Sequence, residues 1–113
     1  MKLEGILVPA LFGLAVLLAF SGGAAAGEKA AGPEITIDNF SFGPQAVTVP
    51  KGTLVTWVNH DDIPHTVVSE DLITFRSRPL DTDEKFTFKF DKAGTYTYFC
   101  SIHPKMTAKV TVQ

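Results

Sequence analysis

The residue types best suited to bind a metal lie within one short stretch, residues 100–106. Cys100, His103 and Met106 occur there, and two residues separate each from the next. A thiolate, an imidazole and a thioether form a soft ligand set, and soft sulfur ligands select copper. Each residue has an ordinary alternative, because a free cysteine or a methionine often fills a hydrophobic core and a loop histidine is often only solvated. The regular spacing favours metal binding over these alternatives.

A second imidazole would complete the ligand set of a blue-copper electron-transfer site, which is two histidines, one cysteine and a weak axial methionine. His65, directly after Pro64, is the candidate. Pro64 fixes its own φ angle and biases Ile63 toward an extended backbone, which stiffens the segment that carries the histidine. Sequence spacing alone does not bring His65 to Cys100, and a half-buried histidine at the end of a strand is the alternative.

Two blocks of sequence resemble the small blue copper proteins, the cupredoxins of the amicyanin-like and plastocyanin family. The blocks are 55–59 with Pro64 and His65, and 93–100 with His103, Pro104 and Met106. The two-residue gap between His103 and Met106 is similar to the short ligand loop of the amicyanin-like group, whereas plastocyanins and pseudoazurins have a longer gap. The resemblance covers nearly everything after residue 32.

This resemblance implies both a fold and a function. The fold would be all-β, a Greek-key β-sandwich of the cupredoxin type. The function would be that of a soluble type 1 copper protein, which carries one electron between exported or membrane-bound redox partners while its single copper ion cycles between Cu(I) and Cu(II). The resemblance implies four metal ligands: His65, Cys100, His103 and Met106. It also implies that redox partner proteins dock transiently near the exposed edge of His103.

Two other functions would use the same residues. A periplasmic copper carrier or storage protein would pass on the ion itself, and the same four ligands would serve it. The histidine- or methionine-rich tracts that would favour such a carrier do not occur. A thiol enzyme would place Cys100 beside a histidine, but no motif positions an orienting acid, and four ligands leave no open position for a substrate. We therefore expect no enzymatic activity.

The chain departs from the resemblance at two positions. Amicyanins and plastocyanins usually carry asparagine directly after the first histidine, whereas this chain has Thr66, whose hydroxyl can still donate a hydrogen bond. Asn59 and Ser101 are candidates to connect the two ligand segments by hydrogen bonds. Lys105 stands where the family's short loop usually has an apolar residue. It favours an acidic partner if it faces the docking surface, and it is otherwise simply solvated. The third histidine, His60, we interpret as a solvated loop residue.

The elements that must position these residues are short β-strands. Runs with period-two alternation predict seven or eight of them, and no helical period appears after the first segment of the chain. The predicted strands are 35–37 with a continuation or bend to 42, then 46–49, 53–59, 65–68, 85–90, 95–100 and 109–112. Residues 69–83 are the least regular, with one weak strand expected near 73–75. Tyr96 is either an ordinary core residue or a corner tyrosine whose hydroxyl binds the backbone.

The N-terminal segment reads as a targeting sequence. An apolar run ends in the small residues Ala24 to Ala26, which predicts a cleaved secretory signal peptide over residues 1–26, with a flexible leader over 27–34 and the copper-binding domain over 35–113. A retained membrane anchor is the alternative, although the apolar run is short against the roughly 20 residues that span a bilayer. Cleavage would leave no stable membrane insertion, and the location would be periplasmic or otherwise exported.

Composition excludes several classes of partner and bond. The net charge of −2 argues against nucleic acid, which requires a basic surface. One cysteine cannot form an internal disulfide, although an exported protein would meet an oxidising compartment. Ligation to a metal is a physical reason to keep a free thiol there. We expect a monomer that forms only weak, transient encounters.

Overall fold

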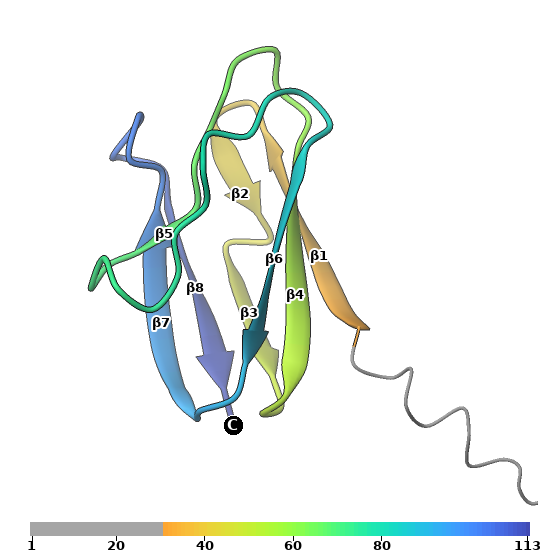
Figure 1. The fold of residues 1–113 in the computed structure, drawn as a ribbon, viewed down its shortest axis with the longest axis vertical. Coiled ribbons are helices and arrows are strands. Elements are labelled where there is room, and N and C mark those ends of the chain that lie inside the picture. The colour runs from red at the N-terminus through yellow and green to blue at the C-terminus, as the bar shows by residue number, and fades with distance from the viewer. Residues whose placement is uncertain (1–30) are drawn as a thin grey trace, which may run out of the picture. The chain divides into compact units, whose positions relative to one another are not determined.

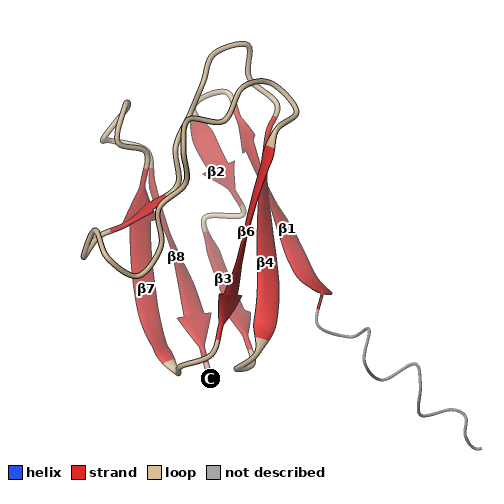
Figure 2. Ribbon diagram, in the orientation of Figure 1, coloured by secondary structure: helices blue, strands red, loops and turns tan. Residues whose placement is uncertain are grey.

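Two four-stranded β-sheets enclose a shared core in the part of the chain that the structure describes, residues 31–113 (Figure 1). Figure 2 shows that residues 31–113 of this computed structural model form strands and loops. The strands are β1 (Ala31–Asp38), β2 (Ser41–Gly43), β3 (Ala46–Val49), β4 (Thr53–Asn59), β5 (Val68–Ser69), β6 (Lys85–Phe90), β7 (Gly94–Phe99) and β8 (Thr107–Val112). Within residues 31–113 there is no helix with the length and apolar character needed to cross a membrane. The predicted all-β sandwich is confirmed.

Strands that are far apart in the sequence lie beside one another in both sheets. One sheet has the order β2-β1-β4-β6, and the other has the order β3-β8-β7-β5. Each sheet is mixed, because β1 runs parallel to β4 and β3 runs parallel to β8 while the other pairs are antiparallel. Alternation in a sequence predicts a strand and its inward face but not its neighbour. These parallel pairings were therefore not predicted.

Aromatic side chains are the main contribution of β4 and β6 to the core. Trp57 on β4 is fully buried and lies opposite Phe86 in the antiparallel β4–β6 pair. Phe90 is buried, and Phe86 and Phe88 pack against the same core from partly buried positions, while the three intervening side chains of β6 are exposed. The inward face predicted for this strand is thus confirmed. Tyr98 of the other sheet meets Trp57 edge-on at 5.4 Å between ring centroids.

The connection between β4 and β6 is less regular than the sequence predicts. The predicted strand over 65–68 is wrong. In this segment only Val68–Ser69, β5, pairs as a strand, and His65 instead forms an isolated bridge with Leu80. The weak strand near 73–75 is also not formed. Phe75 is buried there, and its carbonyl accepts the backbone N–H of Ser69 at 3.0 Å. One buried aromatic and a few bridges, rather than a strand, hold this segment to the core.

The start of the first strand also differs from the sequence interpretation. β1 begins at Ala31, so Ala31 and Glu34, assigned above to the leader, pair with β4. The predicted signal peptide, residues 1–26, and the first part of the leader lie outside the described residues.

Tyr96 is a corner tyrosine, because its hydroxyl donates a hydrogen bond of 2.7 Å to the carbonyl of Lys92. This bond joins β7 to the turn before it.

Candidate metal centre

Three of the four predicted ligands meet at one end of the sandwich. The Sγ atom of Cys100 lies 3.7 Å from Nδ1 of His65 and 3.7 Å from Nδ1 of His103. The ligand atoms of these three residues all lie within 4.8 Å of one another. Cys100 and His65 are fully buried, whereas His103 is partly exposed. The fold therefore brings His65 to Cys100, which sequence spacing could not establish.

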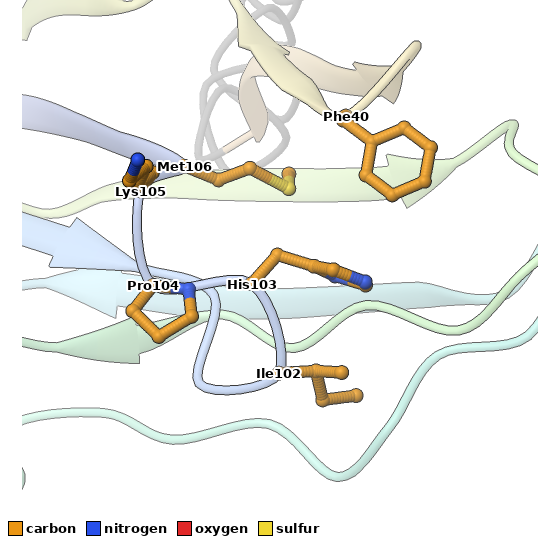
Figure 3. Close-up of a pocket in the computed structure, with 6 residues that line it drawn as sticks. All are labelled: Phe40, Ile102, His103, Pro104, Lys105 and Met106. Atoms are coloured by element: carbon orange, nitrogen blue, oxygen red, sulfur yellow. The ribbon is translucent and has the colours of Figure 1, made fainter.

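The fourth predicted ligand, Met106, is buried on the same loop. Figure 3 shows the side chains of His103 and Met106 extending from this loop in the same direction. The loop follows β7 and ends where β8 begins, so the antiparallel β7–β8 pair supports both of its ends. All four candidate residues thus lie on, or next to, segments fixed by the sheets.

The spacing of the three loop residues has a structural cause. The backbone N–H of His103 donates to the carbonyl of Cys100 at 3.2 Å, and the N–H of Met106 donates to the carbonyl of His103 at 2.9 Å. Each step of three residues is therefore a closed turn. The N–H of Cys100 donates to the carbonyl of Met106 at 3.1 Å and closes the base of the loop. These bonds fix the relative positions of a thiol, an imidazole and a thioether.

His65 is held by its own loop from the side opposite Cys100. Its Nε2 atom lies 2.8 Å from Oδ2 of Asp61, which leaves Nδ1 directed at the cysteine sulfur. Asn59 supports this loop, because its side-chain amide donates to the carbonyls of Ile63 at 2.9 Å and Leu80 at 2.8 Å. The prediction that Asn59 connects the two ligand segments is wrong, since its bonds lie around the His65 loop.

Thr66 and Ser101 form the connection between the two ligand segments. The backbone N–H of Ser101 donates to Oγ1 of Thr66 at 2.7 Å, and the two hydroxyl oxygens lie 2.8 Å apart. The backbone N–H of Thr66 also points at Sγ of Cys100 at 3.4 Å. The role predicted for Ser101 is confirmed. Thr66, a departure from the family pattern, therefore supplies the hydrogen-bonding group on its side of the site.

Two residues that sequence reasoning did not assign to the site also contact it. Burial acts to raise the pKa of the Asp61 carboxyl, but hydrogen bonds from the backbone of Phe40 and Asn39 and from His65 bring that pKa below its ordinary value. The ring of Phe40 lies edge-on to His65 and His103. The one sequence feature that could have indicated Asp61 is the position of a carboxylate four residues before His65. No sequence feature indicated Phe40.

The remaining histidine lies on the surface, in agreement with its interpretation. His60 is 46% exposed and its Nδ1 atom lies 3.5 Å from a carboxylate oxygen of Asp83.

The exposed surface of the site itself is a hollow of mostly apolar character. Its lining residues are Phe40, Ile102, His103, Pro104, Lys105 and Met106 (Figure 3). The edge of one candidate ligand, His103, is therefore surrounded by apolar side chains and one lysine.

Comparison with known proteins agrees with this combination of fold and side chains. A family model described as a cupredoxin-like domain matches residues 10–112. The chain belongs to this cupredoxin-like family. It is 35% identical to an amicyanin of Paracoccus versutus over an alignment that covers 70% of this chain and 63% of the relative. It is 34% identical to a plastocyanin of Scenedesmus fuscus, with 64% of this chain and 86% of the relative covered. The chain thus spans less than two thirds of the length of that amicyanin.

Solved structures of cupredoxins resemble the described sandwich as well. A purple cupredoxin from Nitrosopumilus maritimus has a TM-score of 0.66 and 34% identity, with 73% of this chain and all of that chain covered. The crystal structure of the amicyanin from Paracoccus versutus has a TM-score of 0.66 and 32% identity, with 71% of this chain and 79% of that chain covered. These likenesses extend the family assignment from sequence to three-dimensional structure.

Proposed function

We propose that this protein is a type 1 copper protein that carries single electrons. The proposed ligands are His65, Cys100, His103 and Met106. When bound, copper would supply one-electron redox chemistry by cycling between Cu(I) and Cu(II). The observation that carries the proposal is the convergence of two imidazole nitrogens on one cysteine sulfur, each at 3.7 Å.

The chemistry of the donor set fits copper better than zinc. Zinc in structural sites takes cysteine and histidine, and in catalytic sites it keeps an open position beside histidine or carboxylate ligands. A buried thioether as fourth donor is instead typical of blue-copper sites, where the axial donor tunes the reduction potential. Met106 is 6% exposed and so provides such a donor inside the protein.

The chain's own residues favour electron transfer because they hold the donors in one arrangement. The turns of the 100–106 loop, the Asp61 bond to His65 and the Thr66–Ser101 connection each restrict movement of a donor. A site that rearranges little between two oxidation states has a small barrier to accepting and releasing an electron. The same enclosure opposes a storage role, since release of the ion would require these bonds to open.

Partner proteins would reach the site through His103. It is the only partly exposed member of the three clustered ligands, and the apolar residues Phe40 and Ile102 beside it are about half exposed. A small apolar patch with few charges suits brief contacts with electron donors and acceptors. Lys105 at the edge of this patch favours a partner with an acidic rim. We further propose that the protein acts outside the cytoplasm, after removal of residues 1–26, and that it has no enzymatic activity.

The decisive experiment is a visible absorption spectrum of the protein after addition of Cu(II). We expect an intense blue band from charge transfer between thiolate and copper, which ascorbate bleaches and an oxidant restores. Cys100→Ser should abolish the band, while His60→Ala, a change at the exposed histidine, should leave it intact. A pale or colourless wild-type protein would refute the proposal. Retention of the band in the Cys100 variant would refute the ligand assignment.

A further inference from the structure

A single carboxylate connects His65 to a turn in the sheet opposite β7. Oδ2 of Asp61 lies 2.8 Å from Nε2 of His65 and accepts the backbone N–H of Phe40 at 2.9 Å. Oδ1 accepts the backbone N–H of Asn39 at 2.7 Å. Phe40 and Asn39 lie 21 and 22 residues before Asp61 and form the turn between β1 and β2. The Asp61 side chain, 12% exposed, thus receives donors from two separate segments.

The backbone of this turn is unusual at Phe40. Both central residues are in the left-handed region, with φ angles of 53° at Asn39 and 58° at Phe40. Asparagine adopts this conformation readily in two-residue hairpin turns, whereas a bulky aromatic residue does so rarely. Such a conformation persists where the surrounding structure holds it. Here the two backbone N–H groups of the turn are held by the oxygens of Asp61.

The ring of Phe40 shows what this arrangement accomplishes. Its centroid lies 5.3 Å from that of His65 and 4.9 Å from that of His103, with both contacts edge-on. The ring is half exposed, so it separates parts of both imidazoles from solvent. Glycine would suit a left-handed backbone better than phenylalanine. The side chain, rather than the backbone, therefore accounts for an aromatic residue at this position.

We propose that Asp61 is a positioning residue of the metal centre, which orients the His65 ring and at the same time seats Phe40 over both imidazoles. This inference rests on the proposed function, since it assigns a role in tuning that copper site. A carboxylate that accepts a hydrogen bond from the second nitrogen of a ligating histidine fixes the ring and strengthens it as a ligand. An apolar cover over the ligands limits access of water, which controls the reduction potential.

The first test compares Asp61→Asn with Asp62→Asn, which removes the same charge from the adjacent, exposed residue. Copper affinity and reduction potential are measured on the loaded proteins, and amide hydrogen exchange is measured on the metal-free proteins. Asp61→Asn should lower copper affinity roughly 10- to 100-fold. It should also raise the reduction potential, because an anion beside the ligand favours the more positive oxidised site, and speed exchange at Phe40. Asp62→Asn should match the wild type in all three measurements.

The second test separates the aromatic ring from the backbone of the turn, and it stands even if the Asp61 variant fails to fold. Phe40→Gly and Asn39→Gly both place glycine at a left-handed position of the same turn. Phe40→Gly exposes the imidazoles to water, which stabilises the more highly charged oxidised site, so the reduction potential should fall. Asn39→Gly leaves the ring in place and should leave the potential unchanged.

Either of two results would overturn the inference. One is agreement between the Asp61 and Asp62 variants in affinity, potential and exchange. The other is an equal potential for the Phe40 and Asn39 variants. Failure of the proposed function looks different, because the wild-type protein would then show no blue band. In that case amide exchange at Phe40 in the metal-free proteins still tests whether Asp61 holds the turn, and unchanged exchange would overturn the inference as well.

Discussion

The backbone N–H of Ser101 donates a hydrogen bond of 2.7 Å to the side-chain oxygen of Thr66. These residues directly follow Cys100 and His65, so the bond links the two segments immediately beyond two candidate ligands. The hydroxyls of Thr66 and Ser101 are a further 2.8 Å apart. The separation of the two ligand segments is thereby set by hydrogen bonds of the protein itself.

Replacement of Thr66 by valine should loosen this connection. The shape of the side chain is nearly kept, but the N–H of Ser101 loses its acceptor. Loss of a hydrogen bond at a partly buried site costs about 0.5–1.5 kcal/mol. Urea unfolding of the metal-free protein measures this loss. Thr48→Val, on the exposed face of β3, is the control and should change the free energy of unfolding by less than about 0.5 kcal/mol. Thr66→Asn restores a hydrogen-bonding group and should recover part of the stability that Thr66→Val loses. Equal free energies of unfolding for Thr66→Val and Thr48→Val would contradict the role of the Thr66 hydroxyl.

The two tyrosines of β7 should respond differently to loss of the hydroxyl. Tyr96→Phe removes the bond to the carbonyl of Lys92 and should destabilise the protein by about 1 kcal/mol. Tyr98 is fully buried, and neither its hydroxyl nor Nε1 of Trp57 has a hydrogen-bond partner of good geometry among residues 31–113. Tyr98→Phe should therefore leave stability unchanged or increase it. Thermal unfolding of the two variants checks this order, and a larger loss for Tyr98→Phe would contradict it.

Alkaline pH should destabilise the protein through the same buried tyrosine. Burial raises the pKa of Tyr98 from 10.0 to about 12, opposed in part by the nearby Trp57. The unfolded chain therefore loses this proton at a lower pH than the folded protein does. The contribution of Tyr98 to the free energy of unfolding is therefore fully present below pH 10. It is lost as the pH rises from 10 to 12, and the loss is on the order of 2–3 kcal/mol. Unfolding of the metal-free protein across this range should show the decline in the wild type and in Tyr96→Phe, and a smaller decline in Tyr98→Phe.

Reversal of the charge at Lys105 should alter electron transfer with charged reagents. Lys105 lines the hollow beside His103, so a positive charge there attracts an anionic oxidant such as hexacyanoferrate(III). In Lys105→Glu the oxidation rate of the Cu(I) protein should fall, and the difference from wild type should shrink as salt screens the charges. The control is Lys51→Glu in the exposed turn between β3 and β4. Equal rates for the two variants would place electron transfer away from this surface.

The sequence was sufficient to predict the components of the site that lie within one segment. The steps of three residues from Cys100 to His103 to Met106 proved to be successive turns, each closed by a backbone hydrogen bond. Local spacing of this kind depends on local geometry. The approach of His65 to Cys100 depends on the fold, and it was expected only because the sequence resembles a family in which such residues meet.

The parts that could not be predicted are contacts between segments with no shared pattern. Phe40 lies in the turn after β1, and its approach to His103 follows from how the two sheets face each other. Asp61 is one of two adjacent aspartates, and only the structure distinguishes the one that contacts His65 from its exposed neighbour. Alternation identified the inward face of β6 correctly, but it carried no information about the parallel partner of β1.

The donors come from two connections between strands, and one of these connections crosses from one sheet to the other. His65 lies in the connection that leads from β4 of one sheet to β5 of the other, whereas Cys100, His103 and Met106 lie between β7 and β8. A bound ion would therefore act as a cross-link between these two connections, in a protein whose single cysteine cannot make a disulfide. Separation of the two connections at this end and departure of the metal would then be one event. The lifetime of the folded protein and the residence time of its copper would rise and fall together.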